Sequence, residues 1–262
     1  IESSAPKKSI LNELADKTNA RLLLLHGNET AKKREELGVE KSDENDVKII
    51  FDLYHENPQL FREYRKKTKA EVALKFQFKY LKLLEKTLNR LENMLRAIKD
   101  EYGYTLDELE REKTTIKAKI DDCLDYLIWL ANKVPEYRIL TANFTGIGKK
   151  LAAEFICVIE SIERFKKCSA LERYCLDIET KGCNKDAKNV LLKKQGIVDQ
   201  FIRHKVEPYY SYYQRYKERR LAEGLPKGRA ERNARRAVAK KFLRRFWRKY
   251  HEWKRATLNS FS

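Results

Sequence analysis

The sequence predicts a mainly α-helical protein, in which a short α/β segment precedes a helical hairpin and a basic helical region. Three observations lead to this fold class. Leucines recur every seven residues between positions 74 and 95, two glycines bracket Ile147 ahead of an apolar stretch, and basic residues alternate with apolar ones near the carboxyl end. Sevenfold spacing is typical of packed helices, and paired glycines mark turns between elements.

Residues 1–60 combine strand and helix signals. Four consecutive leucines in Arg21–His26 lie between polar residues, which is typical of a short buried strand. The segment Lys8–Lys17 places Ile10, Leu11 and Leu14 on one face of a helix. We therefore expect an α/β segment here, shorter than a complete α/β domain.

Residues 61–135 carry the pattern of a coiled coil. Two helices are expected, and each carries two lines of apolar residues along one side. On the first helix the lines are Leu74, Leu81, Leu88 and Leu95, and Leu84, Leu91 and Ile98. On the second they are Leu109, Ile116, Cys123 and Leu130, and Ile120, Leu127 and Val134. Gly103 predicts the end of the first helix, and Thr105 with Glu108 predicts a capping box at the start of the second. An antiparallel coiled-coil hairpin follows, and the same apolar lines would also support a homo-oligomer.

Residues 136–262 begin with a two-glycine turn. A short helix is expected before it and another after it, which makes a helix-hairpin-helix. Gly146 and Gly148 let backbone N–H groups approach a phosphate, Ile147 packs inward, and Lys149 and Lys150 face the nucleic-acid backbone. The alternative is a plain turn between two packed helices.

A tyrosine-rich helix follows Pro208. Tyr209, Tyr212, Tyr213 and Tyr216 fall on a single face, because they are spaced three and four residues apart. Such a stripe is typical of a packed core, and the alternative is a surface on which nucleic-acid bases stack.

The last predicted helix is apolar on one face and basic on the others. Its expected inward residues are Ala234, Val238, Phe242, Phe246, Tyr250 and Trp253. The candidate nucleic-acid-binding residues on its other faces are Arg232, Arg235, Arg236, Lys240, Arg244, Arg245 and Arg248. Residues 193–262 hold 21 Lys and Arg against 6 Asp and Glu, so most of the formal net charge of +18 lies there. This excess predicts a polyanionic partner.

Other classes of protein find no support in the sequence. No apolar run approaches the roughly 18 residues that a membrane-spanning helix needs, and no secretory signal is visible. The five cysteines include no C-x-x-C pair, which argues against a disulfide framework and a zinc site. We therefore expect a cytoplasmic protein without a membrane partner.

Several segments together point to a known family: Phe144–Ala153, Ile162–Tyr174, Glu207–Pro208 with the tyrosine helix, Gly224–Gly228 and Ala237–Trp247. In order and spacing they resemble the DEDD transposases of a large bacterial and archaeal insertion-sequence family, recombinases guided by a structured bridge RNA. The resemblance covers nearly the whole chain. It implies a DNA-binding transposase that cleaves and exchanges DNA strands with Mg²⁺, and a guide RNA as a second partner.

The resemblance also implies a catalytic ribonuclease H-like domain with four acidic residues, of which residues 1–60 would be a part. Glu2 matches the second acid, and Asp43 and Asp46 match the third and fourth in a Lys-x-Asp-x-x-Asp motif. The first acid would lie upstream of Ile1. Glu2, Asp43 and Asp46 are thus the implied catalytic residues and Mg²⁺ ligands.

The spacing of the last two acids allows two interpretations. Carboxylates three residues apart share a helix face, where oxygen ligands can bind Mg²⁺ together with phosphate oxygens. The same residues suit a helix start without metal, since Ser42 or Asp43 can cap it and Asp46 interacts favourably with the helix dipole.

The chain departs from the family at the nucleophile. The family carries a serine a little beyond the segment that ends here at Tyr174, and residues 177–190 contain none. Thr180 and Cys183 are the candidate nucleophiles, although each would need an activating group. The alternative function is therefore a transposase-derived protein that binds DNA or RNA without catalysis. A weaker likeness is to the Nop-type proteins of guide-RNA particles, on Asn143–Gly148 and Ala237–Lys241.

Overall fold

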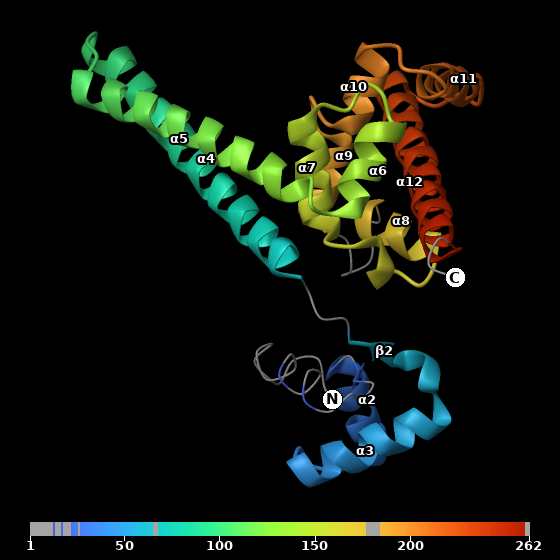
Figure 1. Cartoon of the computed structure of the whole chain (residues 1–262). Coiled ribbons are helices and arrows are strands. Elements are labelled where there is room, and N and C mark those ends of the chain that lie inside the picture. The colour runs from blue at the N-terminus through green and yellow to red at the C-terminus, as the bar shows by residue number, and fades with distance from the viewer. Residues whose placement is uncertain are drawn as a thin grey trace. The chain divides into compact units, whose positions relative to one another are not determined.

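The computed structural model describes residues 13, 17, 22–25, 27–64, 68–176 and 184–259. Over these residues the protein is mainly helical, as predicted (Figure 1). The chain divides into two compact units, Ile1–Thr68 and Lys69–Ser262. The hairpin predicted for residues 61–135 begins at Lys69 and belongs to the same unit as the basic helices that follow it, whereas residues 61–68 belong to the first unit.

The first unit has a small apolar core. Strand β1 pairs antiparallel with β2, with Leu24 opposite Arg62. Leu25, Ile49, Leu53 and Phe61 are buried together. The expected strand thus forms over two residues, and a complete ribonuclease H-like sheet stays a prediction. The described elements are β1 (Leu23–Leu24), α2 (Gly27–Leu37), α3 (Asp43–Glu56), the 3-10 turn η1 (Pro58–Leu60) and β2 (Arg62–Glu63). Of the helix expected at Lys8–Lys17, only Glu13 and Lys17 are described, and both are helical.

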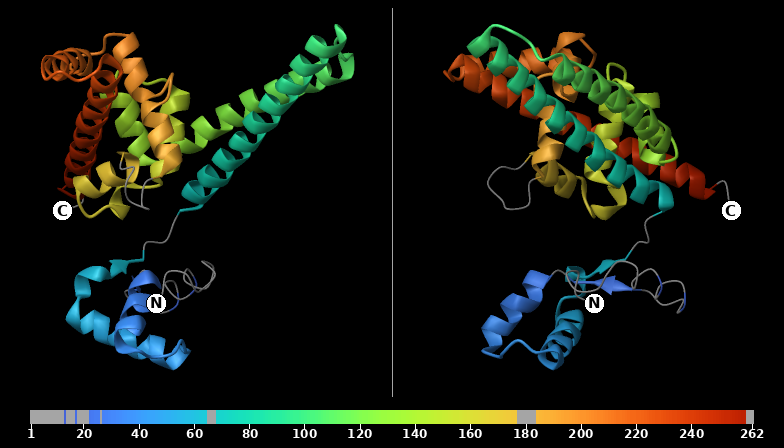
Figure 2. Two further views of the ribbon diagram at one scale, coloured as in Figure 1. Left: turned by 180° about the vertical axis from the view of Figure 1, so that it is seen from behind. Right: turned by 90° about the vertical axis from the view of Figure 1, so that its left-hand side faces the viewer.

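The hairpin consists of α4 (Lys69–Tyr102) and α5 (Asp107–Ala131), which lie side by side and run in opposite directions (Figure 2). Its predicted apolar lines are buried between them, including Leu74, Leu81, Leu84, Leu91 and Leu95 on α4 and Ile116, Ile120, Cys123, Leu127 and Leu130 on α5. These lines are therefore occupied within one chain. Association of two chains stays a prediction.

The start of α5 differs from the prediction. Gly103 does follow α4 with a φ of +73°, which glycine adopts at low cost. The N-cap, however, is Leu106 and not Thr105, and no side chain caps the helix. Three acidic residues in the first turn, Asp107, Glu108 and Glu110, interact favourably with the positive end of the helix dipole instead.

Helix α7 lies at the centre of contacts with α4, α5, α6 and α9, and its residues 152–159 are all buried. Helix α12 runs along one side of the unit and contacts α6, α8, α9, α10 and α11 (Figure 1). These elements are α6 (Pro135–Asn143), α7 (Lys149–Ile159), the 3-10 turn η2 (Ile162–Arg164), α8 (Cys168–Leu176), α9 (Lys185–Leu192), α10 (Ile197–Arg203), α11 (Tyr209–Ala222) and α12 (Lys227–Asn259). Their apolar side chains and the hairpin interior form one continuous core.

Aromatic rings join α12 to this core. Phe242 and Phe246 lie 5.5 and 5.7 Å from Phe155 between ring centroids. Of the inward residues predicted on α12, all are buried except Trp253, whose side chain is 37% exposed. Trp253 lies near the helix end, where its ring centroid is 5.8 Å from that of Tyr250.

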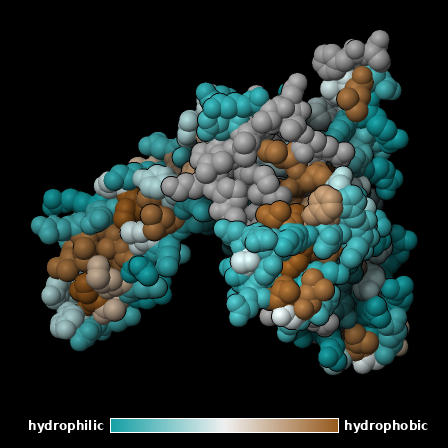
Figure 3. All heavy atoms as spheres, turned by 90° about the horizontal axis from the view of Figure 1, so that it is seen from below, coloured by the Kyte–Doolittle hydropathy of each residue, from teal (hydrophilic) through white to brown (hydrophobic). Residues whose placement is uncertain are grey.

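The surface of the hairpin mixes hydrophilic and apolar side chains (Figure 3). Phe76, Leu83 and Met94 on α4 are among the exposed apolar residues. No helix in the described part of the chain combines the length and apolar character needed to cross a membrane. The four cysteines that are described carry free thiols.

Candidate nucleic-acid interface

A basic cavity of about 1070 Å³ lies between α8, α11 and α12. Eight of its fifteen described lining residues are Lys or Arg, and one is acidic. The basic residues are Arg173 on α8, Arg220 on α11, and Arg236, Lys240, Lys241, Arg244, Arg245 and Arg248 on α12. Three helices therefore direct positive charge at one space.

Helix α12 supplies most of this charge from a single face. Arg236, Lys240, Arg244 and Arg248 are spaced four residues apart, so they lie one above the other along the helix. Like charges at this spacing destabilise a helix by about 0.2–0.5 kcal/mol per pair. A bound polyanion would remove this repulsion.

Glu172 is the one carboxylate in the described lining, and Arg220 is also paired at 2.6 Å with Glu223, which lies outside the lining. Arg244 Nε donates to Glu172 Oε1 at 2.6 Å, and this hydrogen bond raises the pKa of Arg244. Arg236 Nη2 donates to the carbonyl oxygen of Leu176 at 3.0 Å. These two contacts join α12 to α8 and form one wall of the cavity.

Other cations of the cavity are left without protein anions. The side chains of Arg173 and Lys240 are exposed and form no hydrogen bond or ion pair with any residue that the structure describes. Burial lowers the pKa of Lys241, and the nearby Arg215 and Arg245 lower it further. The cavity is therefore an environment in which positive charge is in excess.

The tyrosine stripe of α11 divides between the core and this cavity. Tyr209 and Tyr213 are 1% and 5% exposed and belong to the core. Tyr212 and Tyr216 are half-buried and line the cavity. The packing interpretation thus holds fully for Tyr209 and Tyr213, while Tyr212 and Tyr216 pack against the edge of the core and also line the basic space.

A cation already lies over a face of each of these rings, Lys241 over Tyr212 and Arg220 over Tyr216. Lys241 Nζ is 4.4 Å from the ring centroid of Tyr212. Arg220 Nη2 donates to Tyr216 Oη at 2.9 Å, which lowers the pKa of the phenol. Aromatic and cationic groups are therefore interleaved on the α11 wall.

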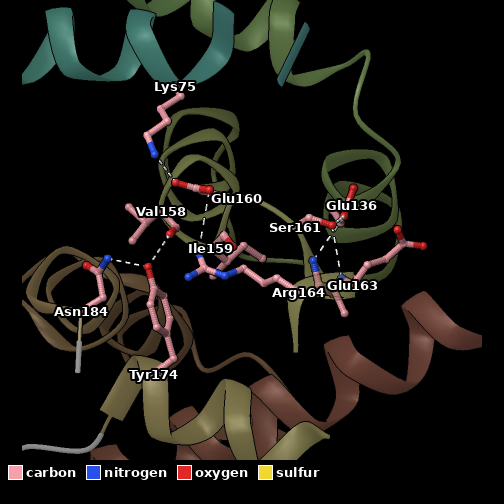
Figure 4. Close-up of polar contacts among 11 residues, drawn as sticks. Lys75, Glu136, Val158, Ile159, Glu160, Ser161, Glu163, Arg164, Tyr174 and Asn184 are labelled. Atoms are coloured by element: carbon pink, nitrogen blue, oxygen red, sulfur yellow. Dashed lines mark hydrogen bonds and ion pairs between the residues drawn. The ribbon is translucent and has the colours of Figure 1, made fainter. Parts of the chain in front are cut away.

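The position of α8 depends on Tyr174 (Figure 4). Its hydroxyl donates to the carbonyl oxygen of Val158 at 3.1 Å and accepts from Asn184 Nδ2 at 2.6 Å. The guanidinium of Arg164 lies 4.7 Å from the ring centroid. These contacts hold α8 against α7 and the start of α9, and thereby place Glu172 in the cavity.

The structure brings together five of the seven basic residues singled out on the last helix: Arg236, Lys240, Arg244, Arg245 and Arg248. Arg235 instead contacts Asp199 of α10 at 3.1 Å. Burial alone would raise the pKa of Asp199, but hydrogen bonds from Gln195 N and Arg235 outweigh it and the pKa is lowered. Arg232 is exposed and does not line the cavity.

The two-glycine turn has a packing role. Gly146 has a φ of +82°, and a Cβ there would lie 2.6 Å from Val206 Cγ2. Ile147 packs against the core, as predicted. Gly148 is the N-cap of α7 and has no side-chain cap. Lys149 is exposed, and Lys150 contacts Glu85 at 3.4 Å. None of Gly146, Gly148, Lys149 and Lys150 lines the cavity.

The acids of the first unit are arranged as a helix start. Ser42 Oγ accepts from Asn45 N at 3.1 Å and caps α3. Asp46 Oδ1 contacts Arg34 Nη1 at 2.6 Å, and Asp43 is exposed in the first turn. Glu2 lies outside the described residues.

Asp43 and Asp46 are the two acids of the implied four-carboxylate metal site that the structure describes. The Arg34 guanidinium contacts one carboxylate oxygen of Asp46. Across residues 22–25, 27–64, 68–176 and 184–259, no group of three or more His, Cys, Asp or Glu side chains is placed to hold a metal ion. The capping interpretation accounts for what is described, and Mg²⁺ binding stays a prediction. Thr180 and Cys183 lie outside the described residues.

Two comparisons with known proteins were negative. No protein-family model matches the chain, and no curated protein matches it significantly in sequence. The function is therefore argued from the site.

Proposed function

We propose that this chain binds nucleic acid through the cavity between α8, α11 and α12, as the DNA-binding part of a transposase-type protein. The observation that carries the proposal is the cavity lining, where eight cations face one carboxylate. Phosphate contacts by Lys and Arg supply most of the affinity of proteins for nucleic acid. The transposase class comes from the sequence resemblance.

The proposal concerns binding alone. Strand cleavage in the resembled family needs the acids matched by Glu2, Asp43 and Asp46, and the described contacts of Asp46 favour a structural role. A transposase-derived binding protein needs only the cavity. DNA strand exchange with Mg²⁺ and a guide RNA stays a prediction from the resemblance.

The proposal can be tested by reversing charge at the exposed cations of the cavity. We expect Arg173→Glu/Lys240→Glu/Arg248→Glu to weaken binding to DNA of about 20 nucleotides, single-stranded or duplex, by at least about tenfold at low salt. Because each lost phosphate contact reduces the slope of log K against log[salt] by roughly 0.9 on a duplex, the slope should become less steep by nearly three. Fluorescence anisotropy at several KCl concentrations measures both.

A matched control lies on the same helix. Lys227→Glu/Arg229→Glu/Arg232→Glu makes the same change in net charge at exposed positions outside the cavity. We expect the control to keep its affinity within about threefold, because local contacts outweigh net charge. Equal losses in both variants, or no loss in the cavity variant, would overturn the proposal.

A further inference from the structure

The size of the cavity restricts what can enter it. About 1070 Å³ is close to the upper end of the range for small-ligand sites, roughly 300–1,000 Å³. A DNA duplex, whose major groove alone is about 12 Å wide, can lie across the mouth of such a space but cannot fill it. A few unpaired nucleotides can.

The lining offers both groups that an unpaired nucleotide presents for recognition. Its phosphate is matched by the cations of α12, of which Lys240 has no protein partner among the described residues. Its base is matched by the half-buried rings of Tyr212 and Tyr216, whose centroids are 6.0 Å apart. A basic groove combined with aromatic rings is the arrangement that binds single strands.

The two rings are not explained by core packing alone. Tyr209 and Tyr213 already fill the core side of α11 and are nearly inaccessible. Lys241 Nζ lies over one face of the Tyr212 ring, 4.4 Å from the ring centroid, so a base stacked on the other face would share the ring with this cation. Ser169 and Asn233 add neutral hydrogen-bonding groups to the same space.

We infer that the cavity binds a few unpaired nucleotides, with their bases stacked on Tyr212 and Tyr216 and their phosphates contacted by Lys240 and Arg248. This inference rests on the proposed function and specifies its substrate as single-stranded nucleic acid or an unpaired end of a duplex. The cavity would recognise a base together with its phosphate, and both DNA and RNA contain this pair of groups.

The test compares a single-stranded oligonucleotide of about 6 thymidines, its uridine counterpart and a blunt duplex. We expect Tyr212→Leu/Tyr216→Leu to weaken single-strand binding by about tenfold or more, because each stacked base contributes substantially to affinity. Blunt-duplex binding should stay within about twofold. The matched control Tyr212→Phe/Tyr216→Phe keeps the rings and should bind single strands as the unaltered chain does. The DNA and RNA arms identify the preferred source.

A second measurement needs no variant. A single strand containing 5-iodouracil, irradiated in complex with the unaltered chain, should cross-link to the peptide that carries Tyr212 and Tyr216. Cross-links confined to other helices, unchanged single-strand affinity in the leucine variant, or tripolyphosphate that competes as well as the oligonucleotide would each overturn the inference. If the variant with reversed charges in the cavity loses duplex binding while the single-strand test fails, the proposed nucleic-acid binding stands and only the inference about unpaired nucleotides is overturned.

Discussion

Glu136 at the start of α6 is a carboxylate that the fold buries almost completely, with 3% of its surface exposed. Its Oε1 accepts hydrogen bonds from Ser161 Oγ at 3.0 Å and from Ile162 N at 3.3 Å (Figure 4). Burial raises the pKa of this carboxyl, and the hydrogen bonds offset only part of that effect. The side chain holds the turn after α7 in place, and because its buried carboxylate titrates, the free energy of folding depends on pH.

We expect the stability of the chain relative to a Glu136→Gln variant to fall as pH rises. The folded state holds the Glu136 proton more tightly than the unfolded state, whose pKa is about 4.3, so this residue favours folding at low pH. That advantage is lost as pH rises from about 4.3 through the raised folded-state pKa. Glutamine keeps an acceptor oxygen and does not titrate. Urea unfolding of both chains across this range measures the difference, and a constant difference would contradict the expectation.

Between the helices α6 and α7, the two glycines of the turn look equivalent in the sequence but differ in the structure. Gly146 needs a left-handed backbone and has Val206 against it, whereas Gly148 has a φ of −65° and open space around its Cα. We expect Gly146→Ala to destabilise the chain by about 2–3 kcal/mol, from backbone strain together with overpacking. Gly148→Ala should cost less than about 1 kcal/mol, as a change of N-cap residue.

The same pair of variants tests the role that the sequence predicted for this turn. If its N–H groups bind phosphate, Gly148→Ala should weaken nucleic-acid binding. Because the turn does not line the cavity, we expect its affinity to stay within about twofold of the unaltered chain. Thermal unfolding and anisotropy on each variant separate the two roles.

At the level of elements, the sequence predicted what depends on local pattern. Heptad spacing identified the hairpin because both of its helices bury one continuous line of apolar residues. The residues of the cavity were harder to predict from the sequence, because neighbours such as Arg235 and Arg236 look equivalent there. One position along a helix is a rotation of about 100°, and this directs Arg235 to Asp199 and Arg236 to the cavity.

Tertiary structure supplied the rest of the site. Arg173 reaches the cavity because α8, which is distant in the chain, packs against α12, and Arg220 reaches it because α11 packs against the helix that follows it. No local pattern marks either residue. The tyrosine stripe was visible in the sequence, but its division between core and cavity depends on where α12 packs against α11.

At the scale of the whole molecule, the cavity and its supporting core lie within one compact unit. All buried residues of the large core fall between Leu74 and Tyr250, and the small core of the first unit is separate. We expect residues 69–262 alone to fold cooperatively and to bind nucleic acid within about threefold of the full chain, since no phosphate contact is removed. Circular dichroism and anisotropy measure this.

The opposite outcome would also be informative. If residues 69–262 fold but lose affinity, the first unit contributes to binding directly. If Mg²⁺ changes nucleic-acid binding only when residues 1–68 are present, that result would support Asp43 and Asp46 as Mg²⁺ ligands.

The division of the α11 tyrosines has a consequence for how this helix can change. The residues that pack in the core and the residues that line the cavity lie on neighbouring faces of α11. Substitution at Tyr212 is therefore expected to alter nucleic-acid recognition while Tyr209 and Tyr213 keep the helix in place. Insertion of a single residue within the stripe, after Tyr209, would turn the tyrosines that follow by about 100° relative to the core. Diversification along this lineage is therefore expected to proceed by replacement of side chains, with the length of α11 held constant.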